Sequence, residues 1–271
     1  QTCALPIWSY NPLSNDWTRL GSPGPNRPGF DEPAAVWDSA GNRMLTFGRS
    51  IDKQNGWDLW SYRSETNAWT QELPSSVRPI GRSGQSAVWD PVDHSMLMYG
   101  GFDNGNGSVV SEELWSFHPE DRIWIRLRPR MALPQARIGQ TAVWDTTGNQ
   151  MLVFGGFSRR RVLNDLWSYQ PSQNASLRLA PAGPLPPARG RHSAVWDNDG
   201  GRMLVFGGAS SVAKADSFMN DLWSYDPAAS TWTLLTPTGA LPPPRFGHSA
   251  VWDSDGGRML VFGGASSAGE P

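Results

Sequence analysis

The sequence predicts an all-β protein, a propeller of four-stranded antiparallel blades, and two observations carry that prediction. A phrase of the type Ser-Ala-Val-Trp-Asp followed by Met-Leu-Val-Phe-Gly-Gly recurs, and its tryptophans are 52, 55, 52 and 56 residues apart, at Trp37, Trp89, Trp144, Trp196 and Trp252. A period of about fifty residues indicates stacked supersecondary units. Each unit also holds four short apolar runs, and none of them keeps helical spacing long enough to predict a helix.

The four runs are clearest in the unit at 192–235, and we name them strands A to D: 192–196, 203–206, 221–225 and 231–235. They are rich in Val, Trp, Phe and Tyr, which favour strands. The A–B connections at 197–201 and 253–257 carry Asp-Gly and Gly-Gly pairs, which supply the positive φ of a tight hairpin turn. Strands A and B are therefore antiparallel neighbours, and four such strands predict one propeller blade.

Tryptophan is expected to supply much of the core, because each buried aromatic side chain removes about 150–250 Å² from water. Strand C carries one in every unit, at Trp8, Trp60, Trp115, Trp167 and Trp223. Strand D carries one at Trp17, Trp69, Trp124 and Trp232. In the third unit Leu177 is aligned with the strand D tryptophan, which predicts a smaller side chain and a looser blade edge there.

Glycine pairs and arginines recur in register with the tryptophans. The pairs follow strand B at Gly100, Gly101, Gly155, Gly156, Gly207, Gly208, Gly263 and Gly264. The arginines stand seven residues before the strand A tryptophan, at Arg82, Arg137, Arg189 and Arg245. Together with Asn-Asp-Leu-Trp at 164–167 and 220–223, this pattern resembles the kelch-repeat β-propeller family, which includes galactose oxidase-like propellers. We expect the glycines to form tight turns and the arginines to pack between blades.

The repeats predict a single propeller domain over residues 8–264, with a leader or scar at 1–7 and a tail at 265–271. Complete blades are expected at 30–73, 85–127, 140–179 and 192–235. Strands C and D at 8–20 and strands A and B at 248–262 are two half-blades, whose pairing would close a five-bladed ring and remove its open edges. Because kelch propellers more often have six or seven blades, a fragment of a longer propeller is the alternative.

Composition limits the partners more than it identifies them. The net charge of −2 favours neither nucleic acid nor an anionic membrane, and no apolar run approaches the ~20 residues of a membrane span. Cys3 has no second cysteine with which to form an intrachain disulfide. The compartment stays open, with a secreted or cell-surface location favoured. We expect a monomer whose partner is a protein or a glycan.

The long B–C and D–A loops lie together on one face of a propeller, and variable loops on a rigid scaffold are where binding usually resides. They cover residues 102–112, 157–163, 209–219, 179–189 and 236–245. The third blade adds an arginine-rich patch to this face: Arg128, Arg130, Arg137, Arg159, Arg160 and Arg161. Such a patch would bind carboxylates, sulfates or phosphates. The competing interpretation is a solvated, repulsive cluster without a ligand.

The sequence assigns no catalytic residue, and neither a metal nor another cofactor is expected. His192 and His248 occupy positions held by Gln85 and Gln140 in other units, which favours buried hydrogen-bonding groups over catalytic bases. The acidic residues at 197–200 and 253–256 are explained by hairpin turns rather than by calcium loops.

Three functions follow from the resemblance and the loops. The favoured one is a non-enzymatic recognition module displayed by a larger bacterial-type protein. A copper-radical oxidase similar to galactose oxidase is disfavoured, because that chemistry needs a cysteine cross-linked to a tyrosine and Cys3 is the single cysteine. The alternative is a cofactor-free sugar-processing enzyme similar to kelch-like sialic acid epimerases. Glu112 and Glu113 are the nearest carboxylate pair for such a site.

Overall fold

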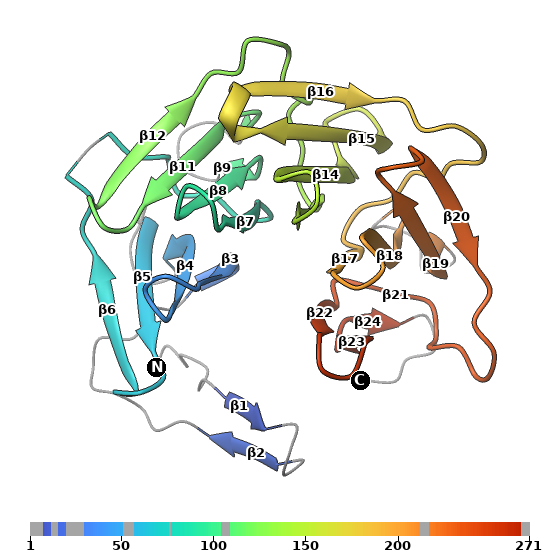
Figure 1. Ribbon diagram of the computed structural model, residues 1–271, viewed down its shortest axis with the longest axis horizontal. Coiled ribbons are helices and arrows are strands. Elements are labelled where there is room, and N and C mark those ends of the chain that lie inside the picture. Colours follow the sequence, from blue (N-terminus) through green and yellow to red (C-terminus); the bar gives the residue numbers. More distant parts are fainter. Residues whose placement is uncertain are drawn as a thin grey trace.

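The computed structural model describes residues 8–11, 16–19, 30–50, 57–75, 77–103, 109–211 and 217–266. Four four-stranded antiparallel sheets follow one another along an arc, and each has its strands in chain order from the centre outward (Figure 1). This arrangement confirms the prediction of an all-β propeller with four-stranded blades. The predicted leader at 1–7 and most of the predicted tail lie outside the described residues.

The strand bounds agree with the four runs of each repeat. Blade 1 contains β3 (Phe30–Asp38), β4 (Arg43–Ser50), β5 (Trp57–Arg63) and β6 (Ala68–Glu72). Blade 2 contains β7 (Ser86–Asp90), β8 (Ser95–Tyr99), β11 (Leu114–His118) and β12 (Ile123–Leu127). Blade 3 contains β13 (Thr141–Asp145), β14 (Gln150–Phe157), β15 (Val162–Gln170), the one-turn η1 (Pro171–Gln173) and β16 (Ala175–Leu179). Blade 4 contains β17 (Ser193–Asp197), β18 (Arg202–Ala209), β19 (Phe218–Asp226) and β20 (Thr231–Leu235).

The two terminal hairpins do not join into a fifth blade within the described residues. β1 (Trp8–Asn11) with β2 (Asp16–Arg19), and β22 (Ser249–Asp253) with β23 (Arg258–Phe262), form separate two-stranded sheets at the open side of the arc (Figure 1). Among the described strands, the expected closure by two plus two strands is therefore not formed. Short ladders join β9 (Phe102–Asp103) to β10 (Val109–Val110) and β21 (Arg245–Phe246) to β24 (Ala265–Ser266).

Blades 2, 3 and 4 each contain a buried arginine that joins strand B to strand C. Arg189 has no exposed surface, and its Nη1 donates to the carbonyl of Gly207 at 2.9 Å. Its two Nη atoms also donate to the Asp221 carboxylate, both at 2.7 Å. Arg245 makes the same bond to the Gly263 carbonyl at 2.9 Å, but no described carboxylate pairs with it. In the complete blades the partner acid lies two residues before the strand C tryptophan, and before Trp8 the sequence places Pro6 there.

The strand pairing corrects the alignment of strand D in blade 3. In the other complete blades the strand D tryptophan lies opposite an aromatic residue of strand C, and these pairs are Tyr62 with Trp69, Phe117 with Trp124, and Tyr225 with Trp232. The residue opposite Tyr169 is Ser176, whereas Leu177 is the next residue and is 50% exposed. Ser176, and not Leu177, therefore stands where the other blades have tryptophan.

This replacement falls at the junction of blades 2 and 3. At the next junction Trp232 packs on Phe154 of blade 3, with ring centroids 4.9 Å apart, and at the preceding one Trp124 packs on Phe47 of blade 1 at 5.3 Å. Ser176 brings no indole to the equivalent position. Because a serine fills far less volume than a tryptophan, this junction is the one at which space between blades is expected.

Candidate binding site

The structure does not bring the six predicted arginines into one cluster. The main chains of Arg128 and Arg130 lie against the C–D turn of blade 3: Asn174 Nδ2 donates to the Arg128 carbonyl at 3.1 Å, and the Arg130 amide donates to the Asn174 carbonyl at 3.0 Å. Residues 159–161 instead lie on the B–C loop of blade 3. All five of these arginine side chains are exposed.

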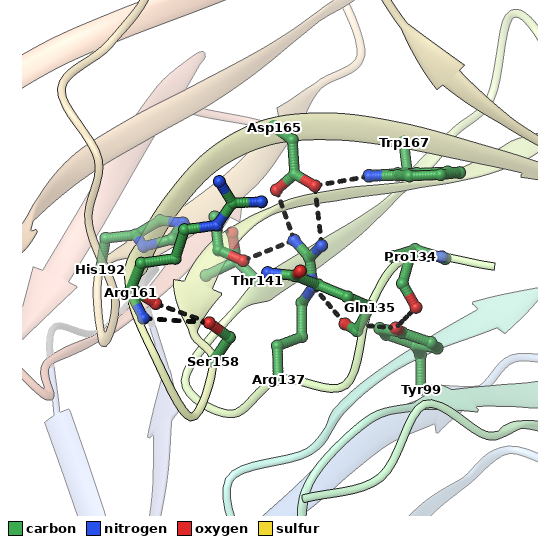
Figure 2. A network of polar contacts seen from close by, with 11 residues as sticks. Tyr99, Pro134, Gln135, Arg137, Thr141, Ser158, Arg161, Asp165, Trp167 and His192 are labelled. Atoms are coloured by element: carbon green, nitrogen blue, oxygen red, sulfur yellow. Dashed lines mark hydrogen bonds and ion pairs between the residues drawn. The ribbon is translucent and has the colours of Figure 1, made fainter.

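Arg137 belongs to the scaffold and not to an exposed patch, contrary to the sequence-based hypothesis. Its side chain has no exposed surface, and its guanidinium donates to both Asp165 oxygens at 2.7 and 2.8 Å (Figure 2). Its Nε donates to the Gln135 carbonyl, and Trp167 Nε1 donates to Asp165 at 2.7 Å. Burial raises the pKa of Asp165, but the bonds from Arg137 and Trp167 outweigh it and hold the pKa below its ordinary value. Arg137 is thus occupied by protein groups.

The B–C loop of blade 3 is a tight turn organised by Ser158. Its Oγ donates to the Arg161 carbonyl at 2.9 Å and accepts from the Arg161 amide at 3.2 Å (Figure 2). It also accepts from the Arg160 amide at 3.4 Å. This bonding fixes the turn while its three consecutive arginine side chains remain exposed. Consecutive residues of a turn point in different directions, so only part of the run can face one ligand.

Two adjoining clefts open on the loop face between blades 2 and 3, with volumes of about 430 and 440 Å³. Glu112 and Leu133 line both of them. Residues that line only the first include Arg161, Asn164, Trp167 and Arg178. Residues that line only the second include Glu113, Arg126, Arg128 and Met131. We call these two clefts together the groove. Two of the predicted arginines, Arg128 and Arg161, therefore line it.

The groove carries more free positive than free negative charge. Arg128, Arg161 and Arg178 are exposed, and their side chains have no hydrogen bond or ion pair with the described part of the chain. Arg126 pairs with Glu113 at 3.1 Å. Among the carboxylates, Glu112 is exposed and has no described partner.

Glu113 is committed to the scaffold. It accepts from Arg82 Nη2 at 2.8 Å and from Trp115 Nε1 at 3.0 Å. Burial raises its pKa, but these bonds outweigh the burial and lower the pKa below its ordinary value. The pair Glu112 and Glu113 thus provides one free carboxylate to the groove and not two.

Arg178 is a site residue that the sequence analysis missed. It lies opposite Trp167 in the β15–β16 ladder, so the guanidinium and the indole stand on the same side of the blade. The alternation of β16 would have placed it there once the strand was aligned on Ser176. The alignment on Leu177 shifts the strand by one residue, which would place Arg178 on the other side of the blade.

The two strand A histidines lie in the blade interior. His192 is 4% exposed, and its Nε2 lies 2.8 Å from Thr141 Oγ1. Burial lowers the pKa of His192 well below its ordinary value and lowers that of His248 to about 4. Within the described ranges, no group of three or more His, Cys, Asp or Glu residues is placed to hold a metal ion. No helix among these residues is long and apolar enough to cross a membrane.

Comparison with known proteins gives one family and several distant relatives. The family described as Attractin/LZTR1 beta-propeller matches residues 5–144 and 44–270. The chain is 27% identical to Multiple epidermal growth factor-like domains protein 8 of Mus musculus over 220 residues, which are 79% of this chain and 8% of that protein. It is 28% identical to Host cell factor 1 of Rattus norvegicus over 229 residues, which are 76% of this chain and 11% of that protein.

The chain therefore spans about a tenth of the length of these relatives. Both relatives are mammalian, and neither supports the expected bacterial-type host protein. The match places the chain among β-propellers, while the narrower likeness to galactose oxidase stays a prediction.

Proposed function

We propose that this chain, which belongs to the Attractin/LZTR1 β-propeller family, is a non-enzymatic recognition module that binds an acidic segment of a partner protein through the groove between blades 2 and 3. The observation that carries the proposal is the set of three exposed, unpaired guanidinium groups around that groove: Arg128, Arg161 and Arg178. Arginine binds carboxylates through two parallel hydrogen bonds, which gives direction as well as strength.

The groove also has the apolar surface that a protein ligand needs. Leu133 borders both clefts, while Trp167 and Met131 each line one. Each cleft has the volume of an ordinary ligand pocket, about 300–1,000 Å³. Such a groove can accept an apolar side chain of the partner between its walls, while acidic residues next to that side chain bind the arginines at the rim.

The alternative is a cofactor-free sugar-processing enzyme on the same face. Acid–base chemistry on a sugar commonly uses two carboxylates of different protonation. Here Glu113 is held by Arg82 and Arg126, so Glu112 is the carboxylate left for chemistry. This favours recognition over catalysis, and a sulfated or sialylated glycan would be recognised by the same arginines.

The test is a binding array that carries acidic peptides together with sulfated and sialylated glycans, probed at low and high salt. We expect an acidic peptide to bind in a salt-sensitive manner, because exposed charge pairs are screened. The double variant Arg161→Ala with Arg178→Ala should weaken binding at least about tenfold, since two charge-assisted contacts are lost.

The matched control is the double variant Arg159→Ala with Arg160→Ala, which removes equal charge from the same loop but spares the groove. It should bind as the unaltered protein does. Equal loss in both double variants would show that general surface charge drives binding and would contradict the proposed groove. A glycan hit accompanied by turnover of the bound sugar would favour the enzyme, and a blank array on folded protein would overturn the acidic ligand.

A further inference from the structure

A third cleft lies at the same junction of blades 2 and 3 but on the opposite face, among the short A–B and C–D turns. Its volume is about 390 Å³, and its lining includes Asp90, Asp93, Trp144, Asn149, Gln170 and Pro171. No basic side chain is among its lining residues. The sequence analysis assigned nothing to this face.

The A–B turns of the other units contain a side-chain hydrogen bond that is missing beside this cleft. Strand A ends in an aspartate, and the residue five positions later donates to its second carboxylate oxygen. In three units that donor is an arginine Nε at 2.8 Å, in the pairs Asp38 with Arg43, Asp197 with Arg202, and Asp253 with Arg258. In blade 3 it is the amide of Gln150, which donates to Asp145 at 2.8 Å.

Blade 2 departs from this pattern. Asp90 Oδ1 accepts from the amides of Val92 and Asp93 at 2.9 and 3.1 Å, as in the other turns. The residue five positions later is Ser95, which is too short to reach the second oxygen. The Ser95 hydroxyl is fully buried and has no partner within the described part of the chain. Asp90 Oδ2 also has no described partner, but unlike Ser95 Oγ it is not fully buried: Asp90 is 1% exposed and lines the cleft.

An unpaired buried carboxylate is costly, and it can relieve that cost by gaining a donor. Burial raises the pKa of Asp90 and outweighs the backbone bonds from Asp93 and Val92, which lower it; the Asp93 charge adds a smaller increase and His94 a smaller decrease. Within the described residues this cleft has no group of three or more His, Cys, Asp or Glu side chains placed to hold a metal ion. A positively charged donor would supply the missing hydrogen bond to Asp90 and balance the negative charge of Asp93.

We propose that this cleft binds an arginine side chain of a partner protein, whose guanidinium takes the position that Arg43, Arg202 and Arg258 occupy in the other units. Asp90 Oδ2 is the acceptor. Asp93 provides a second, more exposed carboxylate, whose Oδ2 lies 3.9 Å from His118 Nε2. The Trp144 indole on the cleft wall offers a surface on which a planar cation stacks. The site is independent of the groove on the loop face and would engage a second segment or a second partner.

The experiment is a titration of ¹⁵N-tryptophan-labelled protein with N-acetyl-arginine methylamide, followed through the indole resonances. Trp144 should shift in a saturable manner, whereas its blade 4 equivalent Trp196 should not. The citrulline analogue, which has the same shape without charge, should bind at least about tenfold more weakly, because charge-assisted bonds are roughly twice as strong as neutral ones.

Two variants decide whether Asp90 is the acceptor. Ser95→Arg supplies the missing donor from within the chain and should abolish binding, while Ser95→Ala leaves the cleft open and should not change it. Asp90→Asn preserves the turn but removes the charge, so it should weaken binding at least about tenfold even if Ser95→Arg fails to fold. Equal binding of the arginine and citrulline probes, retained binding in folded Ser95→Arg or in Asp90→Asn, or the absence of any shift at Trp144 at millimolar probe would overturn the proposal.

Discussion

The junction between blades 3 and 4 is filled, whereas the junction between blades 2 and 3 has clefts on both faces. At the filled junction Trp232 packs on Phe154, and the Gln150 amide donates to the second oxygen of Asp145. At the open junction the corresponding strand D and strand B positions are Ser176 and Ser95. Residues such as Tyr99 and Met151 still form a buried cluster between the two clefts, so the junctions differ at their edges, and we call the one with clefts open. The difference indicates that binding sites in this scaffold lie where the repeat is broken.

The largest loss of stability should come from replacing the buried arginines, which are present on both sides of the comparison. Arg137→Met and Arg189→Met should each lower the free energy of unfolding by about 3–5 kcal/mol, because each leaves a partly buried carboxylate without its partner. Arg245→Met should cost less than about 1 kcal/mol, since Arg245 has no described carboxylate partner. Urea unfolding measures all three. Equal losses at Arg137 and Arg245 would show that these ion pairs do not hold the blades.

The next largest effect is a difference in stability between substitutions at the two junctions. Trp232→Ala should lower the free energy of unfolding by about 3–5 kcal/mol, because it empties the space against Phe154. Ser176→Ala should change it by less than about 1 kcal/mol and in the stabilising direction, because the buried Ser176 hydroxyl has no described partner. Thermal and urea unfolding provide the comparison. A large loss for Ser176→Ala would contradict an open junction.

A smaller effect is a pH dependence of stability, to which His192 at the filled junction contributes. His192 stands where blade 3 has Gln140, which donates to the Tyr99 carbonyl at 2.9 Å. Burial lowers the pKa of His192, so below about pH 6.5 the unfolded chain binds a proton that the folded protein does not. Stability should therefore fall as the pH falls from about 6.5, by up to about 1.4 kcal/mol per pH unit for this histidine.

His192→Gln should reduce that slope by the contribution of His192 and keep the fold, since glutamine occupies the same position at Gln85 and Gln140. His248, whose pKa burial lowers to about 4, contributes in the same direction and remains in the variant. The measurement is urea unfolding between pH 7.5 and 5 for both proteins. An unchanged slope in His192→Gln would show that His192 is not the titrating group.

The repeat made the blades predictable, because turn glycines, strand aromatics and their spacing are local features of the sequence. Contacts between distant residues were not predictable from it. The burial of Arg137 depends on Asp165, 28 residues away, and the place of Ser176 depends on its pairing with Tyr169. β16 has no aromatic residue to fix its alignment, which also hid Arg178. The loss of an arginine at Ser95 is visible in the aligned repeats, but its meaning depends on the cleft beside Asp90.

The most direct test of the account is a single indole spectrum of ¹⁵N-tryptophan-labelled protein, titrated first with an acidic peptide selected from the array and then with N-acetyl-arginine methylamide. Trp167 and Trp144 line the clefts on the two faces of the open junction, and Trp223 and Trp196 are their blade 4 equivalents. The acidic peptide should shift Trp167 and the arginine probe should shift Trp144, while both blade 4 resonances stay in place. Shifts of equal size at Trp223 and Trp196, or none at the open junction, would contradict the claim that binding occurs where the repeat is broken.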